Sequence, residues 1–184
     1  LFLVALFPGM REGEIMGLCW DSVDFSAGTI TIRQQLQRHQ HAYILTTPKN
    51  GKTRKIQPAP FVMQILREEK ADQVKARLQA GAVWEDGPAY VFTNAIGQHM
   101  KRQTIYQHFK KLVISLGLPE VRFHDLRHSY AVAAIRAGDD LKTVSENLGH
   151  ASVSFTLDVY GHVTGDMRKS SADRMQQYIS ALQA

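Results

Sequence analysis

Glycine and proline interrupt the sequence at short intervals, and their positions constrain the fold more than any other feature. Pro8-Gly9 ends the first apolar stretch, while Gly117, Gly138 and Gly149 each follow a segment whose apolar residues recur at helical spacing. Glycine commonly ends a helix, because it adopts the left-handed backbone conformation without a steric penalty. We therefore expect a mainly helical chain built from several separate helices.

The apolar spacing predicts seven helices, which cover residues 1–7, 11–19, 60–79, 102–116, 124–137, 141–148 and 166–184. Two of them have clear apolar faces, formed by Phe61, Ile65 and Leu66 in the third and by Ile105, Phe109, Leu112 and Val113 in the fourth. The last helix is amphipathic, with an apolar stripe of Met167, Met175, Tyr178, Ile179 and Leu182.

Three short β segments are expected between the second and third helices. Residues 29–33 and 42–47 alternate and are rich in β-branched side chains, and residues 54–57 form a third segment after an Asn-Gly turn at 50–51. They predict a small three-stranded antiparallel meander with a lysine at its turn. With the helices, this makes an α+β, mainly helical fold, and residues 1–184 are long enough for one domain with its own core.

Composition limits the classes of function without choosing one. The chain has 22 Lys and Arg against 17 Asp and Glu, a net charge of +5, which is compatible with a polyanionic partner. The single cysteine, Cys19, excludes an internal disulfide and a cysteine-cluster metal site, and its apolar neighbours predict a buried, inert thiol in a reducing compartment. The apolar start, Leu1–Phe7, is too short to span a bilayer, so we expect no membrane association.

The densest polar cluster is H-D-L-R-H at 124–128. In a helix, His124, Arg127 and His128 share one face. The two histidines have the spacing of zinc proteases, with Asp125 in place of the glutamate base, but Arg127 would put a fixed positive charge beside the metal. The same face could instead bind an anion, because a guanidinium beside an imidazole suits phosphate oxygens, or it could be an ion-paired surface.

Other motifs accompany this cluster. In order along the chain they are G-M-R-E-G-E-I at 9–15, P-K-N-G-K-T-R at 48–54, H-D-L-R-H-S-Y at 124–130, L-G-H-A-S at 148–152 and T-L-D-V-Y-G-H-V at 156–163. Together they resemble the catalytic domain of the tyrosine recombinases, the phage integrase family. The residues of the last two motifs are most similar to those of integrases from conjugative transposons and from temperate phages of Gram-positive bacteria.

The resemblance implies a set of catalytic residues. Tyr160 matches the nucleophile, which attacks the scissile phosphate and forms a 3′-phosphotyrosine bond. Arg11 and Arg127 match the two arginines that clamp the phosphate. His124 matches the histidine that bonds the phosphate and assists proton transfer, and His150 matches a second histidine that donates to a non-bridging oxygen.

Two further positions follow from the same resemblance. Glu14 matches an acidic position that supports the site. Lys49 matches the β-hairpin lysine that protonates the leaving 5′-oxygen, with Lys52 as a rival. His162 fits the motif but has no role that we can derive. No cofactor and no metal ion are expected.

The resemblance also implies a setting. Residues 1–184 would be a catalytic domain that lacks the start of its first helix and the family's N-terminal DNA-binding domain, in the bacterial cytoplasm at the nucleoid. Its partner would be double-stranded DNA carrying attachment sites, bound by a tetramer of identical chains, with accessory DNA-bending or directionality factors. The helix at 166–184 could dock on a neighbouring copy or fold back on its own domain.

Four functional hypotheses stand at this point: a recombinase, an inactive DNA-binding or assembly module, a zinc hydrolase, and a type IB topoisomerase. The complete set of six catalytic residues argues against the inactive module. The H-D-L-R-H and L-G-H motifs favour a recombinase over a topoisomerase.

Overall fold

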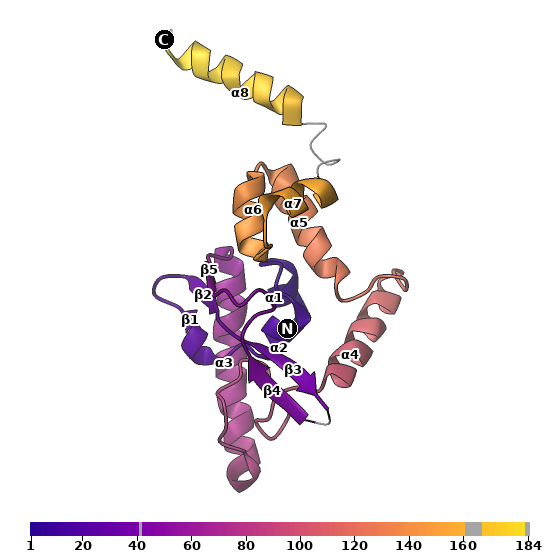
Figure 1. Ribbon diagram of the computed structural model, residues 1–184. Coiled ribbons are helices and arrows are strands. Elements are labelled where there is room, and N and C mark those ends of the chain that lie inside the picture. The colour runs from indigo at the N-terminus through magenta and orange to yellow at the C-terminus, as the bar shows by residue number, and fades with distance from the viewer. Residues whose placement is uncertain (41, 161–166, 183–184) are drawn as a thin grey trace.

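The computed structural model describes residues 1–40, 42–160 and 167–182 (Figure 1). Its helices are α1 (Phe2–Leu6), α2 (Glu12–Met16), α3 (Pro60–Ala80), α4 (Arg102–Ser115), α5 (Asp125–Ala137), α6 (Leu141–Leu148), α7 (Val153–Tyr160) and α8 (Met167–Leu182). The strands are β1 (Val23–Asp24), β2 (Thr29–Ile32), β3 (Gln35–His39), β4 (Ala42–Thr46) and β5 (Arg54–Ile56). The mainly helical α+β class is confirmed, and α7 is a helix that the sequence pattern did not predict.

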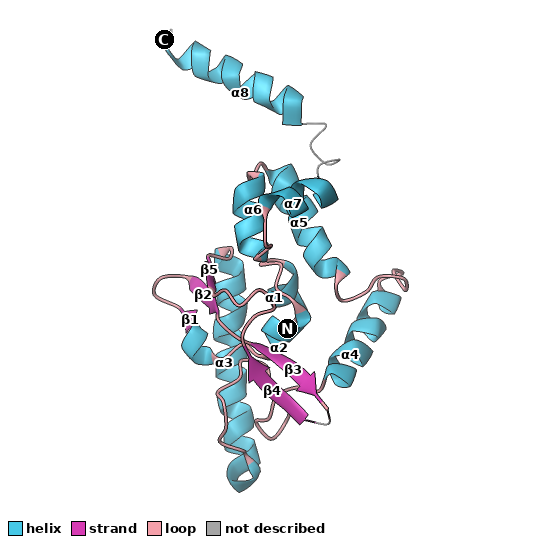
Figure 2. Ribbon diagram, viewed as in Figure 1, coloured by secondary structure: helices cyan, strands magenta, loops and turns pink. Residues whose placement is uncertain are grey.

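A three-stranded antiparallel sheet is present, and two of its strands, β2 and β5, are those predicted, but its third strand is β1 and not the predicted segment 42–47 (Figure 2). Strand β2 lies between β1 and β5, with Ile30 opposite Ile56. The predicted middle strand, β4, instead pairs with β3 in a separate hairpin, with Leu36 opposite Leu45. Strand β3 escaped prediction because its sequence is polar, with Leu36 its one buried residue. The lysine-bearing segment therefore joins two sheets and is not a hairpin turn.

Two clusters of buried side chains hold the helices and the three-stranded sheet together. The first packs α1, α2 and α3 on the three-stranded sheet and includes Val4, Ile15, Ile30 and Leu66. The second packs α5, α6 and α7 on one another around Ile135, Val144, Leu148 and Tyr160. Burying each large aliphatic side chain stabilises the fold by about 1.5–3 kcal/mol.

Two predicted core positions are wrong. Phe61 is 46% exposed, and its ring packs edge-on against Phe7, because the buried face of α3 is rotated to Val62, Met63 and Leu66. Leu112 is 40% exposed, because the buried stripe of α4 is narrow and consists of Ile105, Phe109 and Val113. The buried Cys19 is as predicted, and burial raises the pKa of its thiol.

Helix α8 stands apart from the rest of the described chain (Figure 1). Met175, Tyr178, Ile179 and Leu182 of its apolar stripe are all exposed, so the described part of the chain does not cover them. Met167 begins the helix, but its side chain lies outside the described residues. Across the described ranges, every helix is too short or too polar to cross a membrane.

Candidate active site

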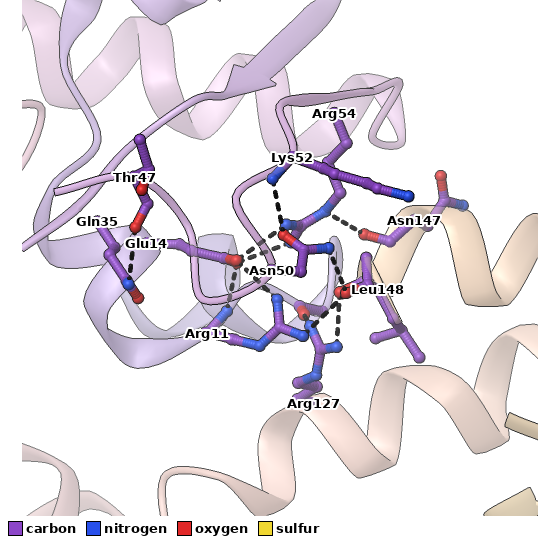
Figure 3. Close-up of polar contacts among 12 residues, drawn as sticks. Arg11, Glu14, Gln35, Thr47, Asn50, Lys52, Arg54, Arg127, Asn147 and Leu148 are labelled. Atoms are coloured by element: carbon purple, nitrogen blue, oxygen red, sulfur yellow. Dashed lines mark hydrogen bonds and ion pairs between the residues drawn. The ribbon is translucent and has the colours of Figure 1, made fainter. Parts of the chain in front are cut away.

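The C-terminal end of α6 gathers three arginines that lie far apart in the sequence. Asp140 begins this helix by accepting hydrogen bonds from the backbone N–H groups of Lys142 and Thr143, and Gly149 ends it with a φ of 63°. Three successive backbone carbonyls at its end each accept a hydrogen bond from a different arginine: Asn147 from Arg54 at 2.8 Å, Leu148 from Arg127 at 2.6 Å and Gly149 from Arg11 at 3.0 Å (Figure 3). The partial negative charge of a helix C-terminus favours cations at this position.

Glu14 holds two of these arginines together. Its buried carboxylate accepts hydrogen bonds from Nη1 of Arg11 at 2.9 Å and from Nη1 and Nη2 of Arg54 at 2.8 and 2.7 Å (Figure 3). It also accepts one from the backbone N–H of Arg11 at 2.9 Å, which caps α2. Burial alone would raise the pKa of Glu14, but the hydrogen bonds and charges of Arg54 and Arg11 outweigh it and lower that pKa. Glu14 is therefore a carboxylate at neutral pH.

Arg127 is fixed inside the protein. It is 4% exposed and donates from Nη1 to the Gly9 carbonyl at 2.7 Å as well as to Leu148. Burial, followed by the charge of Arg11, lowers the pKa of Arg127 to about 9, so it stays a cation at neutral pH. Two guanidinium groups are thus held near each other at an electrostatic cost, as expected of a site that binds an anion.

His150 directly follows these carbonyls. Its Nδ1 lies 2.7 Å from the hydroxyl oxygen of the fully buried Thr156 on α7. Burial, then the charges of Arg127 and Arg11, lower the pKa of His150 to about 4, so the ring is neutral at pH 7. When the Thr156 hydroxyl donates its hydrogen bond to Nδ1 of the neutral His150 ring, the other ring nitrogen, Nε2, carries the hydrogen and can donate to a bound molecule.

Tyr160 ends α7 with its hydroxyl against α5. Nδ1 of His128 lies 2.6 Å from the Tyr160 Oη, and the His128 ring meets the His124 ring edge-on at 4.8 Å. Burial raises the pKa of Tyr160, and Arg127 opposes this rise. Burial is also the largest cause that lowers the pKa of His124, ahead of the charges of His128 and Arg127.

The lysine-bearing loop reaches the same place from the other side. Asn50 donates to the Gly149 carbonyl at 3.3 Å and accepts from the backbone N–H of Lys52 at 3.2 Å (Figure 3). Lys49 and Lys52 are both exposed, so either ammonium group is free to turn toward a molecule bound at the arginines.

The structure thus gathers the predicted residues Arg11, Glu14, Arg127, His150 and Tyr160, with His124 and the lysine loop at the edge. His162 lies outside the described residues. Sequence reasoning missed two participants. Arg54 stands inside the P-K-N-G-K-T-R motif, and His128 was placed on the His124 face without a role. Within the described ranges, no three His, Cys, Asp or Glu side chains gather closely enough to hold a metal ion.

This fold is that of tyrosine recombinase catalytic domains. The structure is similar to that of the Tn1549 transposon integrase solved with transposon right-end DNA, with a TM-score of 0.76 and 25% identity over 95% of this chain and 57% of that one. The model of the phage integrase family matches residues 1–166, and the chain belongs to this family.

Curated relatives agree with this placement. A tyrosine recombinase XerC-like protein of Caldanaerobacter subterraneus is 29% identical over 95% of this chain and 48% of its own length. The ICEBs1 integrase of Bacillus subtilis is 27% identical over 97% of this chain and 48% of its own length. The chain therefore spans about half the length of these relatives.

Proposed function

We propose that residues 1–184 are the catalytic domain of a site-specific DNA recombinase, an integrase of a prophage or other mobile element. One observation carries the proposal: the buried Tyr160 lies near enough to the fixed Arg127 for the guanidinium charge to act on its hydroxyl, and Arg11 lies beside Arg127 in turn. This pairs a nucleophile with a binding site for its anionic target. The family membership and the likeness to an integrase solved with transposon DNA support the same reaction.

In the proposed reaction, Oη of Tyr160 attacks the scissile phosphorus as its proton leaves. The bond from phosphorus to the 5′-oxygen breaks, and that oxygen takes a proton from Lys49 or Lys52. Arg11 and Arg127 balance the charge on the phosphorus oxygens, a task that a divalent metal performs in many phosphoryl-transfer enzymes.

The histidines and the supporting residues complete this assignment. His150 and His124 donate to the phosphate oxygens, and Glu14 keeps Arg11 in position. The covalent 3′-phosphotyrosine preserves the energy of the phosphoester, so rejoining needs neither ATP nor a metal.

The proposed partner is double-stranded DNA with specific attachment sites, in the bacterial cytoplasm at the nucleoid. We further propose that four copies assemble on two DNA sites, with accessory DNA-bending or directionality factors. The exposed stripe of α8 supports docking on a neighbouring copy, because its apolar side chains would otherwise face water.

Trapping on randomised DNA tests the proposal. The protein is incubated in EDTA with a pool of nicked duplexes of randomised sequence, in which cleavage near the nick releases a short strand and traps the enzyme. We expect a protein–DNA adduct that resists denaturation and is lost in Tyr160→Phe. Tyr106→Phe, which changes an exposed tyrosine on α4, should keep it. A parallel reaction without EDTA separates the alternatives: an adduct absent from both reactions would indicate an inactive module, and an adduct formed only without EDTA would indicate metal-dependent chemistry.

A further inference from the structure

His128 and Tyr160 form the most direct contact to the proposed nucleophile. They come from α5 and α7 and lie 32 positions apart in the sequence, yet Nδ1 of His128 is 2.6 Å from the Tyr160 Oη. We propose that His128 is a further catalytic residue, the general base that accepts the phenolic proton of Tyr160. This inference rests on the proposed function, because it assumes that Tyr160 attacks a phosphate.

The state of Tyr160 creates the need for a base. Its side chain is 4% exposed, and burial raises the pKa of its hydroxyl, so the group is a neutral phenol at pH 7. A neutral phenol is a weak nucleophile, and its proton must leave as the bond to phosphorus forms. In the proposed role, Nδ1 of His128 is the unprotonated nitrogen of the neutral ring, so the Tyr160 hydroxyl 2.6 Å away donates to it and its proton points at the acceptor before DNA binds.

The neighbouring imidazoles have different partners. Nδ1 of His150 is bonded to the Thr156 hydroxyl at 2.7 Å, and His124 contacts the ring of His128. Both have lowered pKa values, so neither places a second positive charge beside a protonated His128 at neutral pH.

Among the described residues, the charged groups next to His128 are Asp125 and Arg127 on its own helix, and the neutral hydroxyl of Tyr160 faces it from α7. The Asp125 carboxylate, which forms an ion pair with Arg122, interacts electrostatically with His128 and stabilises the imidazolium that forms. Arg127 acts on the other partner, since its charge opposes the rise in the pKa of Tyr160.

The same proton moves between Tyr160 and His128 in both directions of the proposed reaction. In cleavage, the O–H bond of Tyr160 breaks, its proton goes to Nδ1 of His128, and the oxygen's electron pair forms the bond to phosphorus. In rejoining, a 5′-hydroxyl attacks the phosphorus of the phosphotyrosine and gives its proton to the lysine that had protonated it, and the bond from phosphorus to Oη of Tyr160 breaks. The imidazolium of His128 returns its proton to the departing phenolate.

The test uses a DNA site recovered from the trapped pool and compares His128→Asn with the unaltered protein. The Asn amide can accept the phenol's hydrogen bond but cannot take its proton. At pH 7 we expect the single-turnover cleavage rate to fall by about 10²–10⁴-fold. The deficit should shrink by about tenfold for each pH unit up to the phenol's pKa, because the variant reacts only through its phenolate fraction. His108→Asn, a change of an exposed histidine on α4, should cleave at the unaltered rate throughout.

A second substrate separates the base from the acid. DNA in which sulfur replaces the leaving 5′-oxygen needs no proton donor, because a thiol has a pKa near 8.5, far below that of an alcohol. This substrate should restore cleavage to the variant of whichever lysine, Lys49→Ala or Lys52→Ala, is defective on ordinary DNA. It should leave His128→Asn defective.

The outcomes separate the two proposals. A missing adduct in the unaltered protein, or one that persists in Tyr160→Phe, overturns the proposed function. If both of those controls hold, three results overturn the role of His128 alone: a cleavage rate within twofold of normal, a deficit that does not change with pH, or full rescue by the sulfur substrate. Recovery of His128→Asn at high pH would itself show that the variant is folded.

Discussion

Replacing Glu14 by Gln tests whether the arginine cluster depends on one buried carboxylate. Glu14 accepts four hydrogen bonds in a fully buried position, three of them from guanidinium groups of Arg11 and Arg54. Gln keeps the size of the side chain, but one acceptor oxygen becomes an NH₂ group that faces guanidinium donors. The change also leaves Arg11, Arg54 and Arg127 without the negative charge that they share.

The magnitude follows from the loss of one partner of a buried ion pair. Such losses cost about 3–5 kcal/mol, because the remaining charge stays buried and uncompensated. A domain of this size has a free energy of unfolding of about 5–15 kcal/mol. With a urea dependence of about 2 kcal/mol per molar, the unfolding midpoint should fall by about 2 M.

Equilibrium urea unfolding measures this shift, and α2 supplies a matched control. Glu12 lies two positions away and pairs with the exposed Arg102, with Nη2 3.0 Å from its carboxylate. Since exposed ion pairs contribute at most about 1 kcal/mol, Glu12→Gln should move the midpoint by less than about 0.5 M. Equal shifts for the two variants would refute the idea that Glu14 organises the site.

The pH dependence gives a second check on Glu14. Its pKa in the folded protein is lowered, so its contribution to stability is present above the pKa of an unfolded glutamate, about 4.3. The contribution is lost as the pH falls through the lower folded value. The stability difference between the unaltered protein and Glu14→Gln should therefore be constant from pH 7 to about 5 and shrink in stronger acid. A difference that grows in acid would contradict this sign.

Three other predictions concern the same end of α6. His150, with a pKa of about 4 caused by burial and by the nearby arginines, should stay neutral from about pH 8 to 5. Because an unfolded histidine has a pKa of about 6.5, the free energy of unfolding should decline as the pH falls from 6.5 toward 4, and it should decline less in His150→Gln. An NMR titration in which the His150 ring becomes charged above pH 6 would contradict this prediction. In urea unfolding, Gly149→Ala should lower the free energy of unfolding more than Gly117→Ala. Both glycines have a positive φ, but a Cβ at 149 would lie 2.8 Å from Nη1 of Arg54, whereas the space around 117 is open. The left-handed strain common to both is about 1–2 kcal/mol, and equal losses would refute the steric argument. Arg127→Lys should lower cleavage about 10²–10³-fold, since one ammonium group cannot span two carbonyls, and near-normal cleavage would show that the paired hydrogen bonds are dispensable.

Local sequence signals predicted most of the helices. The span 60–79 matches α3, and 141–148 matches α6, because glycine, proline and apolar spacing act within a few residues of each other. The strand pairing was not predicted, since the polar β3 has no strand signal of its own and forms only through β4. Helix α7 was missed because its apolar residues alternate along V-S-F-T-L-D-V-Y and do not recur at helical spacing.

The sequence by itself determined the family and the chemical types in the site, because five motifs carry arginine, lysine, histidine and tyrosine in a recognisable order. Only the tertiary structure decided how these groups are held. Arg54 reaches Glu14 across 40 positions, and His128 reaches Tyr160 across 32. Such contacts depend on how α2, β5, α5 and α7 pack around the end of α6. Packing of distant segments leaves no periodic mark on the sequence, and so the partner of the proposed nucleophile is visible only in the folded chain.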